Sequence, residues 1–231
     1  MTSPRFYPIG TPGKAWGEAE LEQWRTSQSR QRSYVDDIVA RIEDLSGRFE
    51  TFAYGQLGYD GEQFDLYALR NGSPDPALPT ALITGGVHGY ETSGVMGVLL
   101  FLETRAADYA RKANLLLAPC VSPWAYERIN RWNYNAIDPN RSFHQDSRAT
   151  ECTALMKMVA AQPGSFLTHI DLHETTDSDE SEFRPALAAR DGEEFVPGSV
   201  PDGFYLVDDT DNPQHDFQQA IIAGVEHVTH I

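Results

Sequence analysis

The stretch that decides the fold reads Thr84-Gly85-Gly86-Val87-His88-Gly89-Tyr90-Glu91-Thr92. The apolar residues Ala81-Leu82-Ile83 precede it and are typical of a buried strand, which the two glycines then end. Residues 91–103 follow with apolar side chains at helical spacing. The sequence therefore predicts a strand, a tight loop and a helix, with an imidazole and a carboxylate close together where the strand ends.

Segments on both sides continue this alternation. The predicted helices, which share apolar residues at helical spacing, span 31–45, 147–161 and 212–231. The predicted strands span 64–70, 115–118 and 166–172, and the last two are expected to be buried. Residues 174–202 show no clear periodicity. Such a chain predicts an α/β fold, a single domain with a mostly parallel, mixed and twisted sheet and helices on both faces, which binds ligands at the carboxyl edge of its strands.

Composition limits the possible partners. The chain has 231 residues, 41% of them hydrophobic, which suits one globular domain. Its formal charge of −16 predicts no binding to nucleic acid or anionic membranes. No apolar run reaches the roughly 18 residues of a membrane span, and no signal peptide is recognisable, so a cytoplasmic protein is expected. Cys120 and Cys152 are expected to be core thiols.

Two histidines and a glutamate suggest a metal site. His88 and Glu91 leave the same loop and can reach one ion, but a lone H-x-x-E pair is a weak signal. His173 ends the predicted strand 166–172, and the ends of parallel strands meet at one edge of the sheet. Two imidazoles and a carboxylate with an open fourth position suit zinc best among common ions. We therefore expect one Zn²⁺ per chain.

Residues 129–143 form an irregular stretch rich in amide and guanidinium groups. Arg141 can hold a carboxylate through two parallel hydrogen bonds, and Asn140 can add another. The stretch is therefore interpreted as a clamp for a substrate carboxylate. The alternative is a surface loop whose polar groups satisfy its own turns.

The order of these motifs resembles that of the zinc carboxypeptidase A family. The matching motifs are His88-x-x-Glu91, then D-P-N-R-S-F at 138–143, then D-L-H at 171–173. The Gly-Gly-x-His-Gly-x-Glu form and the short interval to the second histidine most resemble the branch related to succinylglutamate desuccinylase and aspartoacylase. The resemblance implies a zinc carboxypeptidase-like fold and a zinc metallocarboxypeptidase activity, the hydrolysis of an amide bond by metal-activated water.

The resemblance also implies roles for single residues. His88, Glu91 and His173 would bind zinc, and Asn140 and Arg141 would grip the free carboxylate of the substrate. Asp138 would accept a hydrogen bond from the first zinc-bound imidazole. The family has an arginine upstream that polarises the scissile carbonyl. Arg131 is the first candidate for it and Arg128 the second, and spacing does not decide between them.

The glutamate that acts as general base in the family has no clear counterpart. Glu226 lies in a predicted surface helix, and Glu174 would point away from its neighbour His173 in an extended strand. We therefore expect residues 1–231 to be a zinc carboxypeptidase-like catalytic domain that lacks its C-terminal part. A short variant with another base is the alternative.

The sequence is compatible with three functions. The chain is expected to be a carboxypeptidase acting on small peptides with a free carboxylate. The nearest alternative is a deacylase of N-acyl amino acids, and a third is a fragment that binds zinc and a carboxylated ligand without turnover. The remaining histidines, 144, 169, 215, 227 and 230, are expected to be structural or on the surface, and the acidic residues 177, 179, 180 and 182 to form a solvated loop.

Overall fold

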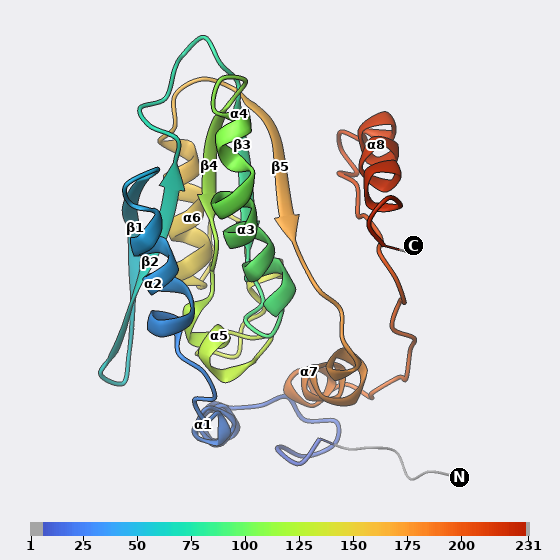
Figure 1. Cartoon of the computed structure of the whole chain (residues 1–231). Coiled ribbons are helices and arrows are strands. Elements are labelled where there is room, and N and C mark those ends of the chain that lie inside the picture. Colours follow the sequence, from blue (N-terminus) through green and yellow to red (C-terminus); the bar gives the residue numbers. More distant parts are fainter. Residues whose placement is uncertain (1–6, 230–231) are drawn as a thin grey trace.

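The computed structural model describes residues 7–229 and centres on a five-stranded sheet in the order β1-β2-β4-β3-β5 (Figure 1). The strands are β1 (Glu50–Tyr59), β2 (Glu62–Arg70), β3 (Thr80–Gly85), β4 (Asn114–Ala118) and β5 (Phe166–Leu172). β1, β2 and β4 pair antiparallel, whereas β4, β3 and β5 are parallel. The predicted α/β fold is thus confirmed, and its parallel part comprises the strands that carry the metal motifs.

Helices lie before, between and after the strands in the chain. They are α1 (Glu18–Ser27), α2 (Ala40–Leu45), α3 (Thr92–Thr104), α4 (Ala106–Tyr109), α5 (Pro123–Arg128), α6 (Thr150–Ala160), α7 (Arg184–Asp191) and α8 (His215–Val225). A π-helical turn, Val35–Val39, leads into α2, and another, Asp179–Phe183, leads into α7. The helices predicted around 31–45, 91–103 and 147–161 are therefore present.

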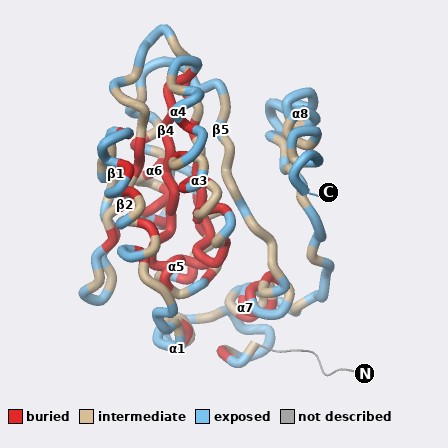
Figure 2. The backbone as a smooth tube through the Cα atoms, in the orientation of Figure 1, coloured by how far each residue is buried: buried red, intermediate tan, exposed pale blue. Residues whose placement is uncertain are grey.

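The two faces of the sheet have separate apolar layers. Leu115 and Leu117 of β4 belong to the larger layer, which includes the buried residues of α2 and α3. Leu116 points the opposite way and packs with Leu155 of α6, as expected for successive residues of a strand. Helices therefore cover both faces, and the tube in Figure 2 is most deeply buried along β4, α3 and α5. Both cysteines are buried, as predicted.

Several elements were not predicted from the sequence. Strand β1 forms a hairpin with β2 through Asp60 and Gly61, which both have positive φ, and this Asp-Gly pair is a strong hairpin signal. The helices α1, α5 and α7 were missed as well. The residues of α7 belong to the stretch 174–202, whose apolar side chains are too sparse to show a period.

Strand β5 is more exposed than predicted. It lies at the edge of the sheet, and the side chain of Leu167 is 68% exposed. The prediction of a buried strand was wrong here, because the sequence of a strand does not show whether another strand pairs with its outer edge. The C-terminal end of β5 is nevertheless in contact with α3 and β3.

Helix α8 stands apart from the sheet in Figures 1 and 2, and none of its residues is buried. It covers the middle of the predicted helix 212–231, whose last residues, including His230, lie outside the described part of the chain. Within residues 7–229, no helix has the length and apolarity needed to cross a bilayer.

Gly94 sets the approach of α3 to β5. A Cβ atom at this position would lie 2.2 Å from the carbonyl oxygen of Leu172, a backbone atom that cannot move aside cheaply. Leu172 directly precedes His173, and Gly94 is three residues after Glu91. A side chain at position 94 would therefore separate the two elements that bring these residues together.

Gly94→Ala is expected to lower the free energy of unfolding by about 3 kcal/mol or more, because the new methyl group overpacks a backbone contact. Gly224→Ala is the control, since no atom lies within 4 Å of the Cβ position at this exposed site of α8. It should leave stability unchanged or raise it by about 0.5–1 kcal/mol. Urea denaturation followed by circular dichroism measures both, and equal midpoints would contradict the tight approach.

Glu151 of α6 is a buried acid without an ion-pair partner among the described residues. Its side chain is 1% exposed, and neither carboxylate oxygen has a hydrogen-bond partner among the described residues. Burial raises the pKa of Glu151 above its ordinary value of 4.5, because the charged form loses its hydration. The native state thus holds the proton more tightly than the unfolded chain does. Native stability should therefore fall as the pH rises above 4.5 toward the folded-state pKa.

Glu151→Gln keeps the shape of the side chain and removes the ionisation. We expect a higher free energy of unfolding than wild type at pH 8, with a difference that shrinks toward pH 5. Urea titrations at several pH values measure this, and the exposed Glu18→Gln is the matched control. A gain that is independent of pH would contradict the interpretation.

Candidate metal centre

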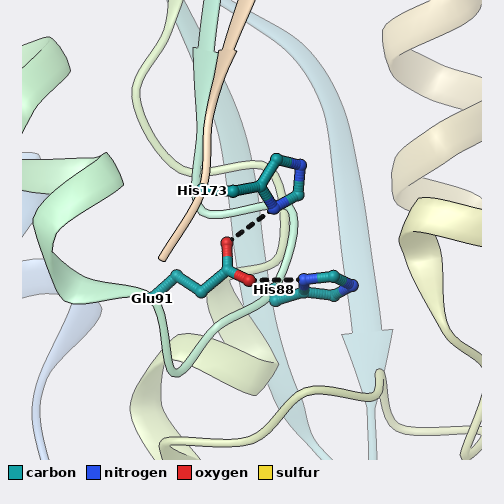
Figure 3. A group of neighbouring side chains, drawn as sticks. All are labelled: His88, Glu91 and His173. Carbon is teal, nitrogen blue, oxygen red and sulfur yellow. Dashed lines mark hydrogen bonds and ion pairs between the residues drawn. The ribbon is translucent and has the colours of Figure 1, made fainter. Parts of the chain in front are cut away.

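His88, Glu91 and His173 converge on one point (Figure 3). Nδ1 of His88 lies 2.6 Å from Oε1 of Glu91, and Nδ1 of His173 lies 2.7 Å from Oε2 of the same carboxylate. The reason is the register of two parallel neighbours, β3 and β5, in which Gly85 pairs with Leu172. The loop after β3 and the residue after β5 therefore meet at the carboxyl edge, as the sequence predicted.

Each imidazole has its own aspartate at Nε2, the ring nitrogen that points away from Glu91. Nε2 of His88 lies 2.9 Å from Oδ1 of Asp138, and Nε2 of His173 lies 2.7 Å from Oδ2 of Asp171. Both rings are thus fixed with Nδ1 toward Glu91, which is the orientation that outer partners give to metal-binding imidazoles. The position of Asp138 agrees with the prediction. Asp171 was missed as an orienting residue, although its spacing of two from His173 on an extended strand places both side chains on one face.

The two imidazoles differ in exposure. His88 is 1% exposed and Glu91 2%, whereas the side chain of His173 is 31% exposed. The centre is therefore closed on the side of His88 and open on the side of His173. An open side is what a catalytic metal needs, since one position must admit water or substrate.

Electrostatics keep the acids of the centre ionised. Burial alone would raise the pKa of Glu91, but hydrogen bonds from His173 and His88 outweigh it and lower the pKa. The same balance lowers the pKa of Asp138 to about 2, through His88 and Arg131. The centre thus presents ionised carboxylates beside two imidazole nitrogens, which favours a cation.

The donor set fits zinc. One ligand atom of each of the three residues lies within 4.8 Å of the others. The ligands of a tetrahedral zinc ion, with bonds of about 2.1 Å, lie roughly 3 to 3.5 Å apart, so these three side chains are close enough to share one ion after small shifts. Among the described residues, no other cluster of histidine, cysteine and acidic side chains meets this criterion.

Arg131, and not Arg128, lies beside the centre. Nε of Arg131 donates to Asp138 at 3.1 Å, and Nη1 donates to Asp179 at 2.9 Å. The guanidinium of Arg128 instead pairs with Glu62 of β2 and lies over the ring of Trp124. Of the two arginines that the sequence left open, Arg131 is thus the one that lies next to the metal centre.

Asp179 is not part of a solvated loop. It is buried, and it accepts a hydrogen bond of 2.7 Å from the hydroxyl of Tyr90 in addition to the one from Arg131. This prediction was wrong for Asp179, because the sequence of an acidic stretch does not show which of its carboxylates has a buried partner. The contacts of Asp179 tie the turn before α7 to the metal loop.

A cavity of about 700 Å³ adjoins Asp138 and Arg131. Its wall is rich in arginine and aromatic side chains, namely those of Arg131, Arg141, Arg148, Arg184, Arg190, Trp16, Trp132 and Phe183. Arg184 pairs with Glu180, and Arg190 pairs with Asp191. Arg141 and Arg148 form no ion pair with any described residue. An anion can therefore enter this cavity without displacing an existing partner of these two arginines.

Asn140 and Arg141 form a short 3₁₀ turn, Pro139–Arg141, directly after Asp138. The backbone N–H of Asn140 donates to Oδ1 of Asp138, which fixes the turn relative to His88. Of the two side chains, Arg141 lines the cavity and Asn140 does not. The structure thus brings one half of the predicted carboxylate clamp to the cavity.

The glutamates considered as general base have other positions. A carboxylate oxygen of Glu174 accepts from the backbone N–H of Ser93 at 3.0 Å, at the start of α3. Glu226 follows α8, away from the sheet. Within residues 7–229, no glutamate other than Glu91 forms a hydrogen bond or ion pair with His88 or His173. His144 is exposed, and His169 contacts the hydroxyl of Thr84.

Comparison with solved structures finds related folds. A metallo-carboxypeptidase from Burkholderia cenocepacia matches 60% of this chain and 40% of its own, with 17% identity and a TM-score of 0.50. A candidate metallopeptidase from Shewanella denitrificans OS217 matches 61% of this chain and 53% of its own, with 26% identity and a TM-score of 0.50. The chain spans about half the length of these structures. The resemblance to zinc carboxypeptidases is thereby confirmed at the level of the fold.

A search of curated protein sequences found no match. The family model described as the succinylglutamate desuccinylase/aspartoacylase catalytic domain matches residues 77–192, which is half of the chain. This range includes both strands that meet at the metal centre and the arginine loop between them. The chain therefore belongs to the succinylglutamate desuccinylase/aspartoacylase catalytic domain family.

Proposed function

We propose that this chain carries the zinc centre of a hydrolase that cleaves an amide bond next to a free carboxylate. The observation that supports it most directly is Glu91 between two imidazoles, each of which is oriented by its own aspartate. Outer carboxylates of this kind commonly orient imidazoles that bind a metal. The proposal assigns the three zinc bonds to His88, Glu91 and His173.

The chain's own residues have separate tasks in this proposal. When bound, zinc supplies Lewis acidity for a carbonyl oxygen and for a water molecule. Asp138 and Asp171 accept hydrogen bonds from Nε2 of the two imidazoles, which fixes the orientation of both rings and leaves Nδ1 as the atom that would bind the metal. Arg131, held by Asp138 and Asp179 through Nε and Nη1, is proposed to stabilise the developing oxyanion with its remaining N–H groups.

Arg141 is proposed to bind the free carboxylate of the substrate. It lines the cavity, it has no ion-pair partner among the described residues, and its guanidinium matches a carboxylate in shape. Asn140 would join the clamp if its side chain turned toward the cavity. The short turn that follows Asp138 keeps both residues near the metal centre, so the scissile bond would lie between the centre and the clamp.

The general base is the part that the described residues do not provide. Glu174 binds the start of α3, and within residues 7–229 no glutamate other than Glu91 forms a hydrogen bond with either imidazole. We propose that the base belongs to a segment outside residues 1–231, in line with the half-length coverage of the matching structures. Under this proposal the chain alone binds zinc and a carboxylated ligand but turns substrate over slowly.

The substrate is either a small peptide or an N-acyl amino acid. The family model favours the acyl substrate, whereas the fold shared with a metallo-carboxypeptidase is compatible with both. Release from an N-blocked dipeptide should be compared with release from N-acetylaspartate and N-succinylglutamate. Activity only on the latter pair would contradict the peptidase, and binding of all three without turnover in a longer chain would contradict a hydrolase.

Wild-type protein is expected to contain close to one zinc per chain, and His173→Ala to lose most of it, because a three-residue site loses one ligand. Mass spectrometry of metal content on purified, folded protein measures both. His144→Ala, which removes an exposed histidine away from the centre, is the matched control and should keep its zinc. A folded wild type without zinc would overturn the proposed function.

Arg141→Met is expected to weaken binding of a carboxylated substrate roughly 10- to 100-fold, because a charge-assisted hydrogen-bonded contact contributes about 1.5–3 kcal/mol. Calorimetric titration of zinc-loaded protein with N-acetylaspartate measures the loss even without turnover. Arg105→Met, which removes an exposed arginine beyond α3, is the control. An unchanged affinity in Arg141→Met would place the carboxylate elsewhere.

A further inference from the structure

We infer that Arg32 is a positioning residue of the metal centre, which it reaches from outside the region matched by the family model. This inference rests on the proposed zinc site. Arg32 precedes that region by more than forty residues, and no metal ligand lies near it in the sequence. In the folded chain its guanidinium nevertheless binds the turn that carries His88 and Glu91.

The contacts of Arg32 bracket both ligands. Nη2 donates to the carbonyl oxygen of Gly89 at 2.5 Å, and Nη1 donates to Oγ1 of Thr92 at 2.7 Å. Gly89 directly follows His88, and Thr92 directly follows Glu91. A rigid, planar group with two donors thus fixes the distance between the two points of the turn from which the ligands project.

The same guanidinium ties this turn to α5. Its Nε donates to the carbonyl oxygen of Tyr126 at 2.6 Å, and it lies over the Tyr126 ring at 3.5 Å from the centroid. The turn is packed against α5 at that place, since a Cβ atom on Gly89 would lie 2.0 Å from the carbonyl carbon of Ala125. Arg32 therefore links the backbone of the metal turn to that of α5 at the place where the two are in direct contact.

A buried glutamate keeps Arg32 in place. Glu127 of α5 is 1% exposed, and its Oε1 accepts from the backbone N–H of Tyr34 and from Arg30. The carbonyl oxygen of Glu127 accepts from the backbone N–H groups of Gln31 and Arg32. The segment around Arg32 is thus anchored on both sides before its side chain reaches the metal turn.

A purely structural arginine provides the comparison. Arg48 also donates to backbone carbonyls of α3, at 3.0 Å to Glu103 and 3.4 Å to Leu102. These acceptors lie at the far end of the helix, away from Glu91. If Arg32 only stabilised the fold, replacing either arginine would have the same kind of effect. If it positions the ligands, only its replacement changes the metal centre.

The experiment compares Arg32→Met, Arg32→Lys and Arg48→Met with the wild type in the full chain. Three quantities are measured: zinc affinity by competition with a chelator, the visible spectrum of the cobalt-substituted protein, and hydrogen exchange of the backbone amides of residues 88–93 in metal-free protein. Loss of an outer partner lowers metal affinity by about 10- to 100-fold in other sites. We expect roughly a tenfold loss for Arg32→Met, an altered cobalt spectrum and faster exchange at 88–93.

The variants separate the possible outcomes. Arg32→Lys keeps the charge but not the planar pair of donors, so we expect a loss of zinc affinity between those of wild type and Arg32→Met. If Arg32→Met does not fold, Arg32→Lys is compared with Arg48→Met instead. Arg48→Met should keep wild-type zinc affinity, spectrum and exchange at 88–93. Equal effects of the two arginines, or an unchanged centre in Arg32→Met, would overturn the inference. A wild type without zinc would overturn the proposed function, while exchange in the metal-free turn still decides the role of Arg32.

Discussion

The carboxylate of Glu91 between two imidazoles is the interaction on which the rest of the structure depends. An ionised carboxylate that is 2% exposed is costly to bury unless every oxygen is paired, and His88 and His173 supply that pairing. The two imidazoles come from the ends of adjacent parallel strands, so the pairing requires the register of β3 and β5 to be correct. A slip of one residue would turn His173 to the opposite face of the sheet and leave the carboxylate half paired.

The surroundings of the two imidazoles give the centre a closed and an open side. On the side of His88, a chain of ionic contacts runs through Asp138 and Arg131 to Asp179, and each acid is balanced by a cation. On the side of His173, Asp171 accepts a hydrogen bond from the hydroxyl of Thr84, and the imidazole itself is 31% exposed. The arrangement holds one ligand rigidly and leaves the other accessible. The neighbouring cavity concentrates arginines in a protein of net charge −16, which makes it a local exception to the acidic surface.

Close backbone contacts connect the metal centre to the surrounding helices and strands. Gly89, in the loop with His88 and Glu91, meets the backbone of α5, and Gly94 of α3 meets the end of β5, so neither position has room for a Cβ atom. Arg32 adds hydrogen bonds at the same place from a segment far away in the chain. The metal centre is therefore also supported by residues outside 77–192, the region that the family model matches.

The sequence by itself determined the strand, loop and helix around His88 and the third ligand His173, because local spacing and strand ends fix which side chains can share an edge. It did not reveal β1, α7 or the buried state of Asp179, and it left Arg131 and Arg128 undecided. Those features depend on contacts between residues distant in the chain, and periodicity within a short window contains no information about them. Only the tertiary structure could show that Asp171 orients the imidazole of His173 and that Arg32 binds the turn with the metal ligands. The hydrogen bonds of a side chain depend on which partner folding brings within about 3 Å, and neighbours in the sequence do not determine that partner.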